Sequence, residues 1–225
     1  MAGRYAGGVT TPEPTPLRRD AERNRARILN AAREVFTADP DATMTSVAQH
    51  AGVGVGTLYR RFPTREDLLT ALYHADHRVY QDILDEALAT ADPWTAFCQY
   101  LQRLCEHQAS GGMRGALTLT PTFSRQLETQ RQQLRNGMQT LIERAQQSGS
   151  LRPDITPEDL QPVIIASAAV VTATARVNPR AWRRALALTL DGFRAEGAHP
   201  LPEPPMTQRE LFRVQRRQMN PGPQP

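Results

Sequence analysis

The stretch AGVGVGTLYRRFPTREDLL, from Ala51 to Leu69, decides the fold of this chain. It opens with three glycines at alternate positions, Gly52, Gly54 and Gly56, and then becomes aromatic and basic. Glycines this close together suit a loop that cradles a phosphate between a hydrophobic strand and a helix. They also suit the turn between two short helices of a DNA-binding motif. The residues that flank the glycines distinguish these two alternatives.

The residues before Gly52 favour a helix over a strand. They read TMTSVAQHA, in which Thr43 is a good helix cap and the following segment is long enough for one to two helical turns. A phosphate-binding loop should follow a strand, so this segment excludes that alternative. A helix, a glycine turn and a second helix form a helix-turn-helix, whose second helix enters the major groove of DNA. We expect Gly52 to adopt the positive φ that the turn requires.

Apolar residues beyond this motif recur at helical spacing, and strand patterns are nearly absent. The expected helices span residues 64–89, 93–108, 123–147, 157–175 and 179–196. Their capping residues are Thr64, Asp92, Thr156 and Asn178. Residues 116–120 alternate like a strand but are isolated, so we assign them to an irregular or short helical link. The sequence therefore predicts an all-α protein.

The positive charge of the chain is concentrated near its start. All 27 basic residues are arginine, against 23 acidic residues, which gives a formal net charge of +4. Six of the arginines lie between Leu17 and Arg33, in the company of only two acidic residues. Clustered arginine beside a helical motif is typical of a nucleic-acid-binding surface, whereas a solvated helix face is the alternative.

The two ends of the chain differ in composition from the middle. Residues 1–20 are rich in Gly, Pro and Thr, and residues 197–225 are rich in Pro, Gln and Arg, so we expect a flexible arm and a flexible tail. The chain has no apolar segment that suits a secretory signal or a membrane span. We therefore expect a cytoplasmic protein with no membrane partner.

Three motifs lie between about Ala21 and Ala71. They read RILNAAREVF at residues 27–36, VAxxAGV at residues 47–53 and GTLYRRFPTREDLL at residues 56–69. In combination they resemble the N-terminal domain of the TetR/AcrR family.

The resemblance implies a homodimeric transcription factor, usually a repressor, and not an enzyme. It implies that residues 21–70 form a three-helix helix-turn-helix DNA-binding domain. Residues 71–196 would form a larger helical domain that binds a ligand and dimerises. The implied partners are a palindromic double-stranded DNA operator, a second copy of the chain and a small-molecule effector. A dimeric DNA-binding protein that acts as an activator, or without an effector, is the alternative.

The resemblance also implies which residues contact DNA. Thr57 and Tyr59 match residues of the second motif helix that contact phosphates and base edges, and Arg65 matches a residue that clamps a phosphate. Gly54 and Gly56 would let backbone N–H groups approach a phosphate at the start of that helix. The full set of expected DNA contacts is Arg23, Arg25, Thr43, Thr45, Gly54, Gly56, Thr57, Tyr59, Arg60, Arg61 and Arg65.

The last two expected helices are strongly apolar, so each must be buried on a broad face. The resemblance implies that they pair with those of a second chain in a four-helix bundle, and close packing within one chain is the alternative. The expected interface residues are Ile164, Ala168, Val171, Trp182, Leu186, Leu190 and Phe193.

We expect an effector pocket between the helices that begin near residues 93, 123 and 157. The expected lining is Trp94, Phe97, Tyr100, Leu101, Leu104, Met113, Phe123, Met138 and Ile142, although any of these could be plain core. The polar residues nearby form no charged cluster, so an apolar or weakly polar ligand is favoured.

Metal binding and catalysis have little support in the sequence. His74 and His77 are three residues apart, but no carboxylate or cysteine motif completes a metal site, so we expect them to be surface histidines. No catalytic motif or nucleotide fingerprint is present. We therefore expect no catalytic residue, no metal and no cofactor.

Overall fold

The computed structural model describes residues 16–39, 41–110 and 125–219. Within these ranges the chain is helical, and its only β-type pairing is a single antiparallel bridge between Leu151 and Arg194. This confirms the all-α prediction. The helices are α1 (Pro16–Ala38), α2 (Met44–Ala51), α3 (Val55–Arg61), α4 (Arg65–Ala89), α5 (Pro93–Ala109), α6 (Arg125–Gln147), α7 (Pro157–Thr174), α8 (Ala181–Gly192) and α9 (Gln208–Met219).

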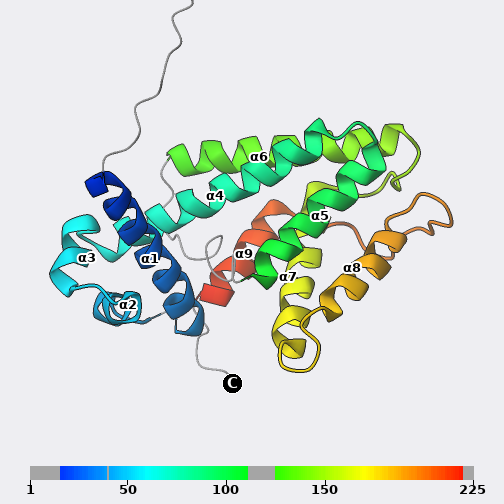
Figure 1. The fold of residues 1–225 in the computed structure, drawn as a ribbon. Helices are drawn as coiled ribbons and strands as arrows, with labels where there is room; N and C mark the ends of the chain where they lie inside the picture. Colours follow the sequence, from blue (N-terminus) through cyan, green and yellow to red (C-terminus); the bar gives the residue numbers. More distant parts are fainter. Residues whose placement is uncertain (1–15, 40, 111–124, 220–225) are drawn as a thin grey trace, which may run out of the picture.

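Helices α1 to α3 gather at one end of the molecule around a small core of their own (Figure 1). Thr43 caps α2 by accepting a hydrogen bond from the backbone N–H of Ser46 (3.1 Å). Gly52 ends α2 with φ of 62°, as the turn was expected to require. The buried side chains of this core include Ile28, Leu29, Phe36, Val47, Leu58, Phe62, Leu68 and Leu72.

Helix α4 runs from this small core into the larger helical bundle (Figure 1). Thr64 and Asp67 form the expected capping box at its start, because the side chain of each residue bonds the backbone N–H of the other. Leu68 and Leu72 lie in the small core, whereas Tyr80 and Leu84 lie in the core that α4 shares with α5 to α8. One helix therefore joins the two cores.

Most of the expected helices are confirmed, with ends displaced by one or two residues, and the start of the predicted helix 123–147 lies outside the described residues. Helix α8 differs more, since it spans Ala181–Gly192 where residues 179–196 were expected. The side chain of Asn178 accepts a hydrogen bond from the backbone N–H of Arg180 (3.1 Å) and so forms a turn before the helix. Residues 116–120 lie outside the described part of the chain.

The predicted flexible ends are partly helical. Helix α1 already begins at Pro16, and residues 1–15 are not described. Helix α9 lies within the predicted flexible tail and packs beside α7. Thr207 and Glu210 bond reciprocally at its start, with Thr207 N–H to Glu210 Oε2 at 2.8 Å and Glu210 N–H to Thr207 Oγ1 at 3.3 Å. The capped amphipathic helix explains why this tail is not uniformly irregular.

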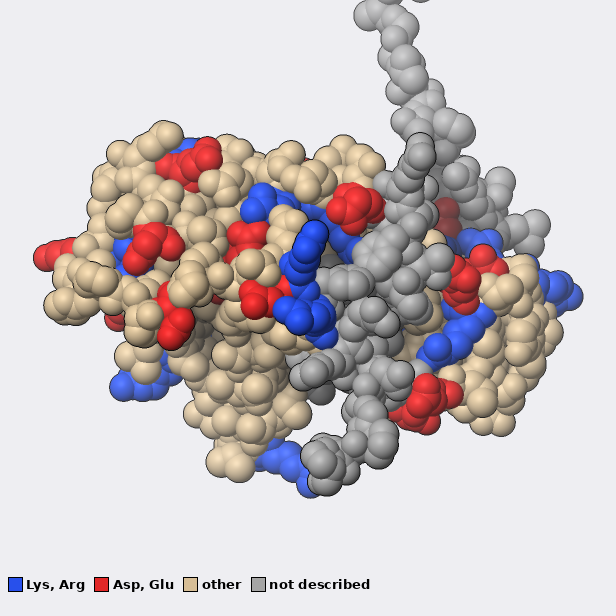
Figure 2. All heavy atoms as spheres, turned by 180° about the vertical axis from the view of Figure 1, so that it is seen from behind, with Lys and Arg blue, Asp and Glu red and all other residues tan. Residues whose placement is uncertain are grey.

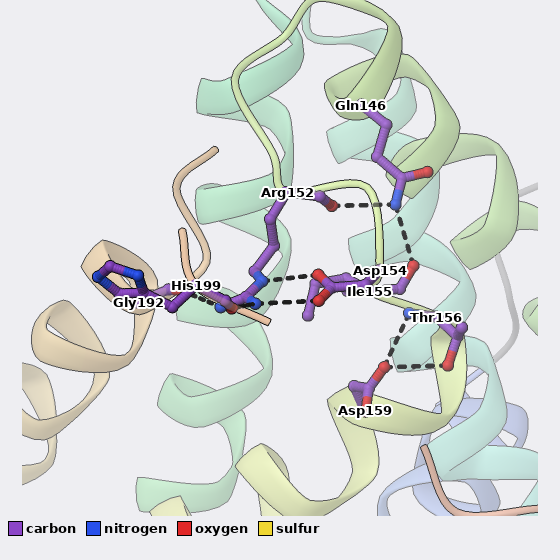
Figure 3. A network of polar contacts seen from close by, with 8 residues as sticks. All are labelled: Gln146, Arg152, Asp154, Ile155, Thr156, Asp159, Gly192 and His199. Carbon is purple, nitrogen blue, oxygen red and sulfur yellow. Dashed lines mark hydrogen bonds and ion pairs between the residues drawn. The ribbon is translucent and has the colours of Figure 1, made fainter. Parts of the chain in front are cut away.

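A buried arginine holds the segment after α8 against the connection between α6 and α7 (Figure 3). Arg152 binds Asp154 through Nε–Oδ1 (2.6 Å) and Nη2–Oδ2 (2.9 Å). Its guanidinium also donates to the backbone carbonyl oxygens of Gly192 and His199. Gln146 donates to the carbonyl oxygens of Arg152 (3.1 Å) and Ile155 (3.0 Å). These bonds fix the chain direction that leads to α9.

None of the helices that the structure describes combines the length and the apolar character needed to cross a membrane.

Candidate DNA-binding surface and ligand pocket

Helix α3 has one buried side and one exposed side. Leu58 is completely buried in the small core and anchors the helix. Tyr59 is 45% exposed, and Arg60 and Arg61 are exposed as well. The side of α3 that faces solvent therefore carries an aromatic ring and two guanidinium groups.

Arg27 holds the turn that positions α3. Its Nη2 donates to the carbonyl oxygens of Ala51 (2.9 Å) and Gly52 (3.0 Å). These carbonyl groups lie at the end of α2, where no further helical N–H is available to bond them. In the sequence Arg27 is one more member of the basic cluster, but in the structure its main contacts are within the motif.

A groove between α1 and α3 brings positive charges together. Burial lowers the pKa of Arg25, and the nearby charges of Arg78 and Arg61 lower it further. Over the described ranges, none of Arg25, Arg60 and Arg61 forms an ion pair with a carboxylate. The groove is lined by Ala21, Asn24, Arg25, Ile28, Thr57, Arg60 and Arg61. Such uncompensated charge suits a polyanion.

The remaining predicted DNA contacts also lie at the surface of this small bundle. Thr43 is exposed just before α2 and Thr45 is exposed on α2, and Arg23 is exposed on α1 beside Asp20, with which it forms an ion pair. Gly54 precedes α3 and provides no side-chain cap, so the first N–H groups of the helix have no side-chain acceptor there. Gly56 has open space around its Cβ position.

The side chain of Arg65 is only partly exposed to solvent. Its guanidinium carbon lies 4.6 Å from the centroid of the Phe36 ring, and Phe36 is buried in the small core. A cation over an aromatic face is favourable, so Arg65 helps to join α4 to α1. Arg65 therefore has a packing role that its expected phosphate contact did not include, and that contact remains a prediction.

Charges of both signs are intermixed over the face of the molecule in Figure 2. The arginines on this face therefore do not form a uniform positive coat. The local positive surface on the helix-turn-helix is instead the groove that holds Arg25, Arg60 and Arg61.

The larger bundle contains a cavity of about 380 Å³ between α4, α5, α6, α7 and α9, which is partly open to solvent. Three of the predicted pocket residues line it, namely Tyr100, Leu104 and Met138. The structure adds residues that no sequence pattern indicated: Tyr73, Tyr80, Glu128, Arg131, Gln132, Leu134, Arg135, Pro157, Glu158, Leu160, Gln161, Ile164, Gln208, Arg209 and Leu211.

The other predicted pocket residues do not line this cavity. Phe97, Leu101 and Ile142 are completely buried core residues, because the apolar face of each helix also packs against its neighbours. The ring of Trp94 instead lies beneath the guanidinium of Arg194, at 4.1 Å from carbon to centroid. Met113 and Phe123 lie outside the described residues.

The outer wall of the cavity is more charged than expected. Nη2 of Arg135 lies 2.7 Å from Oε1 of Glu158, so these two residues form an ion pair between α6 and α7. Arg131 lies over the ring of Tyr73, with 5.4 Å between guanidinium carbon and centroid. The inner wall is apolar and aromatic, which suits a ligand with an apolar body.

The predicted dimer residues mostly belong to the core of the single chain. Ile164, Val171, Trp182, Leu186 and Phe193 are all at most 8% exposed, so their side chains cannot form a surface for a second chain. These residues are buried because the most apolar faces of α7 and α8 pack inward, against other helices of the same chain. Ala168 and Leu190 are half-buried, and the exposed apolar residues of this region include Ala166, Ala169, Ala173, Val177 and Leu188.

The two histidines were expected at the surface, but His77 is only 7% exposed. Its Nε2 lies 3.0 Å from the carbonyl oxygen of Gln130, so it joins α4 to α6. In the part of the chain that the structure describes, no three potential ligand residues are grouped so that they could hold a metal ion.

A helix-turn-helix with an uncompensated arginine surface, joined by one long helix to a helical bundle with a cavity, defines a DNA-binding protein. Comparison with known families agrees. Residues 28–72 match the model described as bacterial regulatory proteins, tetR family. Residues 92–195 match the model described as transcriptional regulator SbtR-like, C-terminal domain. The chain belongs to the TetR family of transcriptional regulators.

Individual relatives are similar over different lengths. The HTH-type transcriptional repressor LfrR of Mycolicibacterium smegmatis is 37% identical over 91 residues, which are 40% of this chain and 47% of LfrR. A TetR regulatory protein from Mycobacterium vanbaalenii is 27% identical, with TM-score 0.50 and coverage of 80% of this chain and 99% of that one. A TetR-family regulator from Marinobacter aquaeolei, 16% identical, shares the fold with TM-score 0.61 over 77% of this chain and 97% of that one.

Proposed function

We propose that this regulator binds a palindromic operator as a homodimer and represses transcription until a small, mainly apolar effector releases it. The observation that carries the proposal is the unpaired arginine groove formed by Arg25, Arg60 and Arg61 beside the exposed side of α3. A groove of this charge would attract phosphates, while Tyr59 and Thr57 would reach the base edges. The relative LfrR is named a repressor, which favours repression over activation.

The homodimer is supported by an exposed apolar strip, defined here as the exposed apolar residues of α7, of α8 and of the connection between them. Leu188 is 62% exposed and Val177 is 90% exposed, although both are large apolar residues. Ala166, Ala169 and Ala173 continue the strip along α7, and their small side chains would allow close helix packing. A second copy related by a two-fold axis would cover this strip and place two α3 helices on two half-sites.

The effector is supported by the cavity of about 380 Å³, which borders the helix that begins beside α3. A ligand that fits better when α4 is tilted must weaken operator binding, because the coupling between two sites is reciprocal. Regulation without a small molecule is the alternative, favoured only if no compound that occupies the cavity changes operator affinity.

In vitro selection of DNA by the purified full-length protein tests the proposal. An enriched palindrome, bound by a dimer in sedimentation experiments, is the expected result. Failure to enrich any sequence, or binding by a monomer to a site without two-fold symmetry, would contradict it. Selected operator DNA then serves to screen compounds for release.

A further inference from the structure

Helix α9 forms part of the cavity wall, although it lies in the tail of the chain. Gln208, Arg209 and Leu211 line the cavity together with residues of α4 to α7. The helix lies beside α7 (Figure 1). It follows residue 195, where the match to the C-terminal family model ends, so the family match assigns it no role. The last helix of the chain therefore supplies one wall of the proposed effector site.

Helix α9 is attached to the bundle by apolar contacts. In the part of α9 whose side chains are described, no residue belongs to either buried core, and none forms a hydrogen bond or an ion pair with another helix. The nearest charged partner of Arg213 is Glu210 of the same helix. Leu211 and Val214 are half-buried apolar side chains three residues apart, on one face of the helix. A helix with so few buried contacts opens at a small cost in free energy.

The connection that leads to α9 is fixed at one point only. Residues 196–205 are all exposed, and Arg152 bonds the backbone carbonyl oxygen of His199 (Figure 3). Beyond His199, no hydrogen bond joins the described residues 200–206 to the bundle. Helix α9 can therefore leave the cavity without breaking the bond at Arg152.

We propose that α9 is a lid on the effector site, which opens to admit an apolar compound and then closes over it through Leu211. This inference rests on the proposed effector function and specifies how its site is completed. With α9 in place the cavity still has a volume of about 380 Å³, so the helix and a ligand can occupy the site together. The helix is therefore a lid that covers the ligand and not a plug that competes with it.

The lining of the cavity favours a neutral apolar body for this ligand. Leu104, Leu160 and Ile164 provide an aliphatic wall, and Tyr100 adds an aromatic ring. A ligand that touches both this wall and Leu211 buries more apolar surface than one that touches the wall alone, and burial of apolar surface drives binding. The charged residues of the outer wall have both signs, so they select neither an anion nor a cation.

Ligand binding and lid closure must stabilise each other. The contact between the ligand and Leu211 exists only when α9 is closed, so a bound ligand shifts the equilibrium towards the closed state. By the same linkage, a change that weakens the closed state weakens ligand binding.

Binding of N-phenyl-1-naphthylamine, a neutral aromatic compound whose fluorescence rises in apolar surroundings, tests the lid in the full-length protein. Leu211→Gln should weaken this binding about tenfold, because an apolar contact is lost. Stopped-flow fluorescence should show the loss as faster dissociation, since a lid that closes poorly retains the compound poorly. Leu201→Gln is the matched control. Leu201 is 47% exposed in the connection and does not line the cavity, so this variant should bind like wild type.

The unfolding midpoint of Leu211→Gln without the compound should equal that of wild type, because Leu211 lies outside both buried cores. A lower midpoint would make Leu211 a structural residue of the bundle and overturn the lid. Equal affinity of the variant and wild type would also overturn it, as would no measurable binding to wild type. Tighter binding by the variant would identify α9 as a plug.

Trypsin cleavage of the wild-type protein provides a second test that needs no substitution. Trypsin cuts after arginine, and Arg209 and Arg213 are exposed on α9. Cleavage requires the helix to open locally, so the compound should slow cleavage at these two sites severalfold. Cleavage after Arg176, which is exposed in the turn after α7 and does not line the cavity, should keep its rate. Equal protection of all three sites, or no protection of α9, would overturn the lid.

The two experiments separate the lid from the proposed function. Neither uses DNA, so failure to select an operator counts against the proposed function alone. A compound that binds under α9 but does not release the selected operator would likewise count against the effector function and not against the lid.

Discussion

A methyl group added at Gly137 would lie 2.4 Å from Cδ2 of Leu84, so α6 and α4 approach each other too closely for any larger residue at this position. Leu84 is completely buried, and its Cγ would lie only 3.3 Å from the same methyl group. The contact holds the helix that carries Arg131 and Arg135 against the helix that leads to the DNA-binding domain. Gly137 is therefore a packing requirement between α6 and α4, on the helix that also carries the cavity residues Leu134, Arg135 and Met138.

Gly137→Ala should lower the free energy of unfolding by about 1–3 kcal/mol, the usual cost of overpacking a core. An exposed helical glycine would show the opposite sign, because alanine is favoured in helices by about 1 kcal/mol. Urea unfolding of the two proteins measures the difference.

The same substitution in a Leu84→Ala background provides the control. There the clash is absent, and Gly137→Ala should stabilise the protein by up to about 1 kcal/mol. Equal effects in both backgrounds would show that the close approach to Leu84 does not matter.

Arg27→Ala should destabilise the protein by about 1–2 kcal/mol and weaken operator binding, because two turn carbonyl groups lose a charged donor. Thermal unfolding and a DNA titration measure the two effects. Arg23→Ala is a suitable comparison, since Arg23 is an exposed arginine of the same helix whose partner, Asp20, is also exposed. A stable Arg27→Ala variant with weak DNA binding would instead assign Arg27 to the DNA contacts.

Local signals made the DNA-binding region predictable. Caps such as Thr43 and Thr64, and the glycine turn at Gly52, act over a few residues and can be recognised in the sequence. The exposure of Tyr59 and the burial of Leu58 follow from helical spacing within the motif. Thr207 and Glu210 carry a similar capping signal for α9, which the Pro-rich composition of the tail obscured.

Longer-range features could not be predicted in the same way. Arg33 and Asp76 are 43 residues apart, and no pattern in either helix indicates that they pair. Phe97 and Tyr100 lie on the same apolar helix, but only Tyr100 reaches the cavity, because its neighbours are set by helix packing. Helical spacing separates Leu186 from Leu188, but only the fold decides that the side of α8 with Leu186 packs within the chain and that Leu188 is exposed.

Arg61→Ala should reduce the salt dependence of operator binding, since it removes one cation from the groove beside α3. The slope of log affinity against log salt concentration should fall in magnitude by about 0.9 for each phosphate that the variant no longer neutralises. Fluorescence anisotropy at several salt concentrations measures the slope. Arg103→Ala changes the net charge equally, but Arg103 lies on α5 beside Glu86, so this variant should keep the wild-type slope. Equal slopes in the wild type and both variants would show that Arg61 does not neutralise a DNA phosphate.

Leu188→Glu should dissociate the proposed homodimer without unfolding the chain, because its side chain is 62% exposed in the single chain. Leu186→Glu should instead unfold the bundle, since Leu186 is 5% exposed. Sedimentation velocity and circular dichroism distinguish the two outcomes. Leu201→Glu places the same charge on another exposed leucine, outside the α7 and α8 strip, and should leave the dimer intact. If the Leu188→Glu protein is still a dimer, the dimer interface does not include Leu188.

The Arg152 network should give the protein a stability that is lost in acid. The hydrogen bond from Arg152 lowers the pKa of Asp154, and its positive charge adds to this effect. An aspartate whose folded pKa is depressed stabilises the fold at pH values above its ordinary pKa of about 4, and the stability is lost as the pH falls through the lower, folded value.

Asp154→Asn should therefore be less stable than wild type at pH 6, and the difference should shrink as the pH falls below about 4. The effect is modest, because the side chain of Asp154 is 41% exposed and solvent screens the pair. Urea unfolding of both proteins at a series of pH values measures the difference, and a gap that stays constant down to the acid limit would mean that Asp154 acts through its shape and not through its charge.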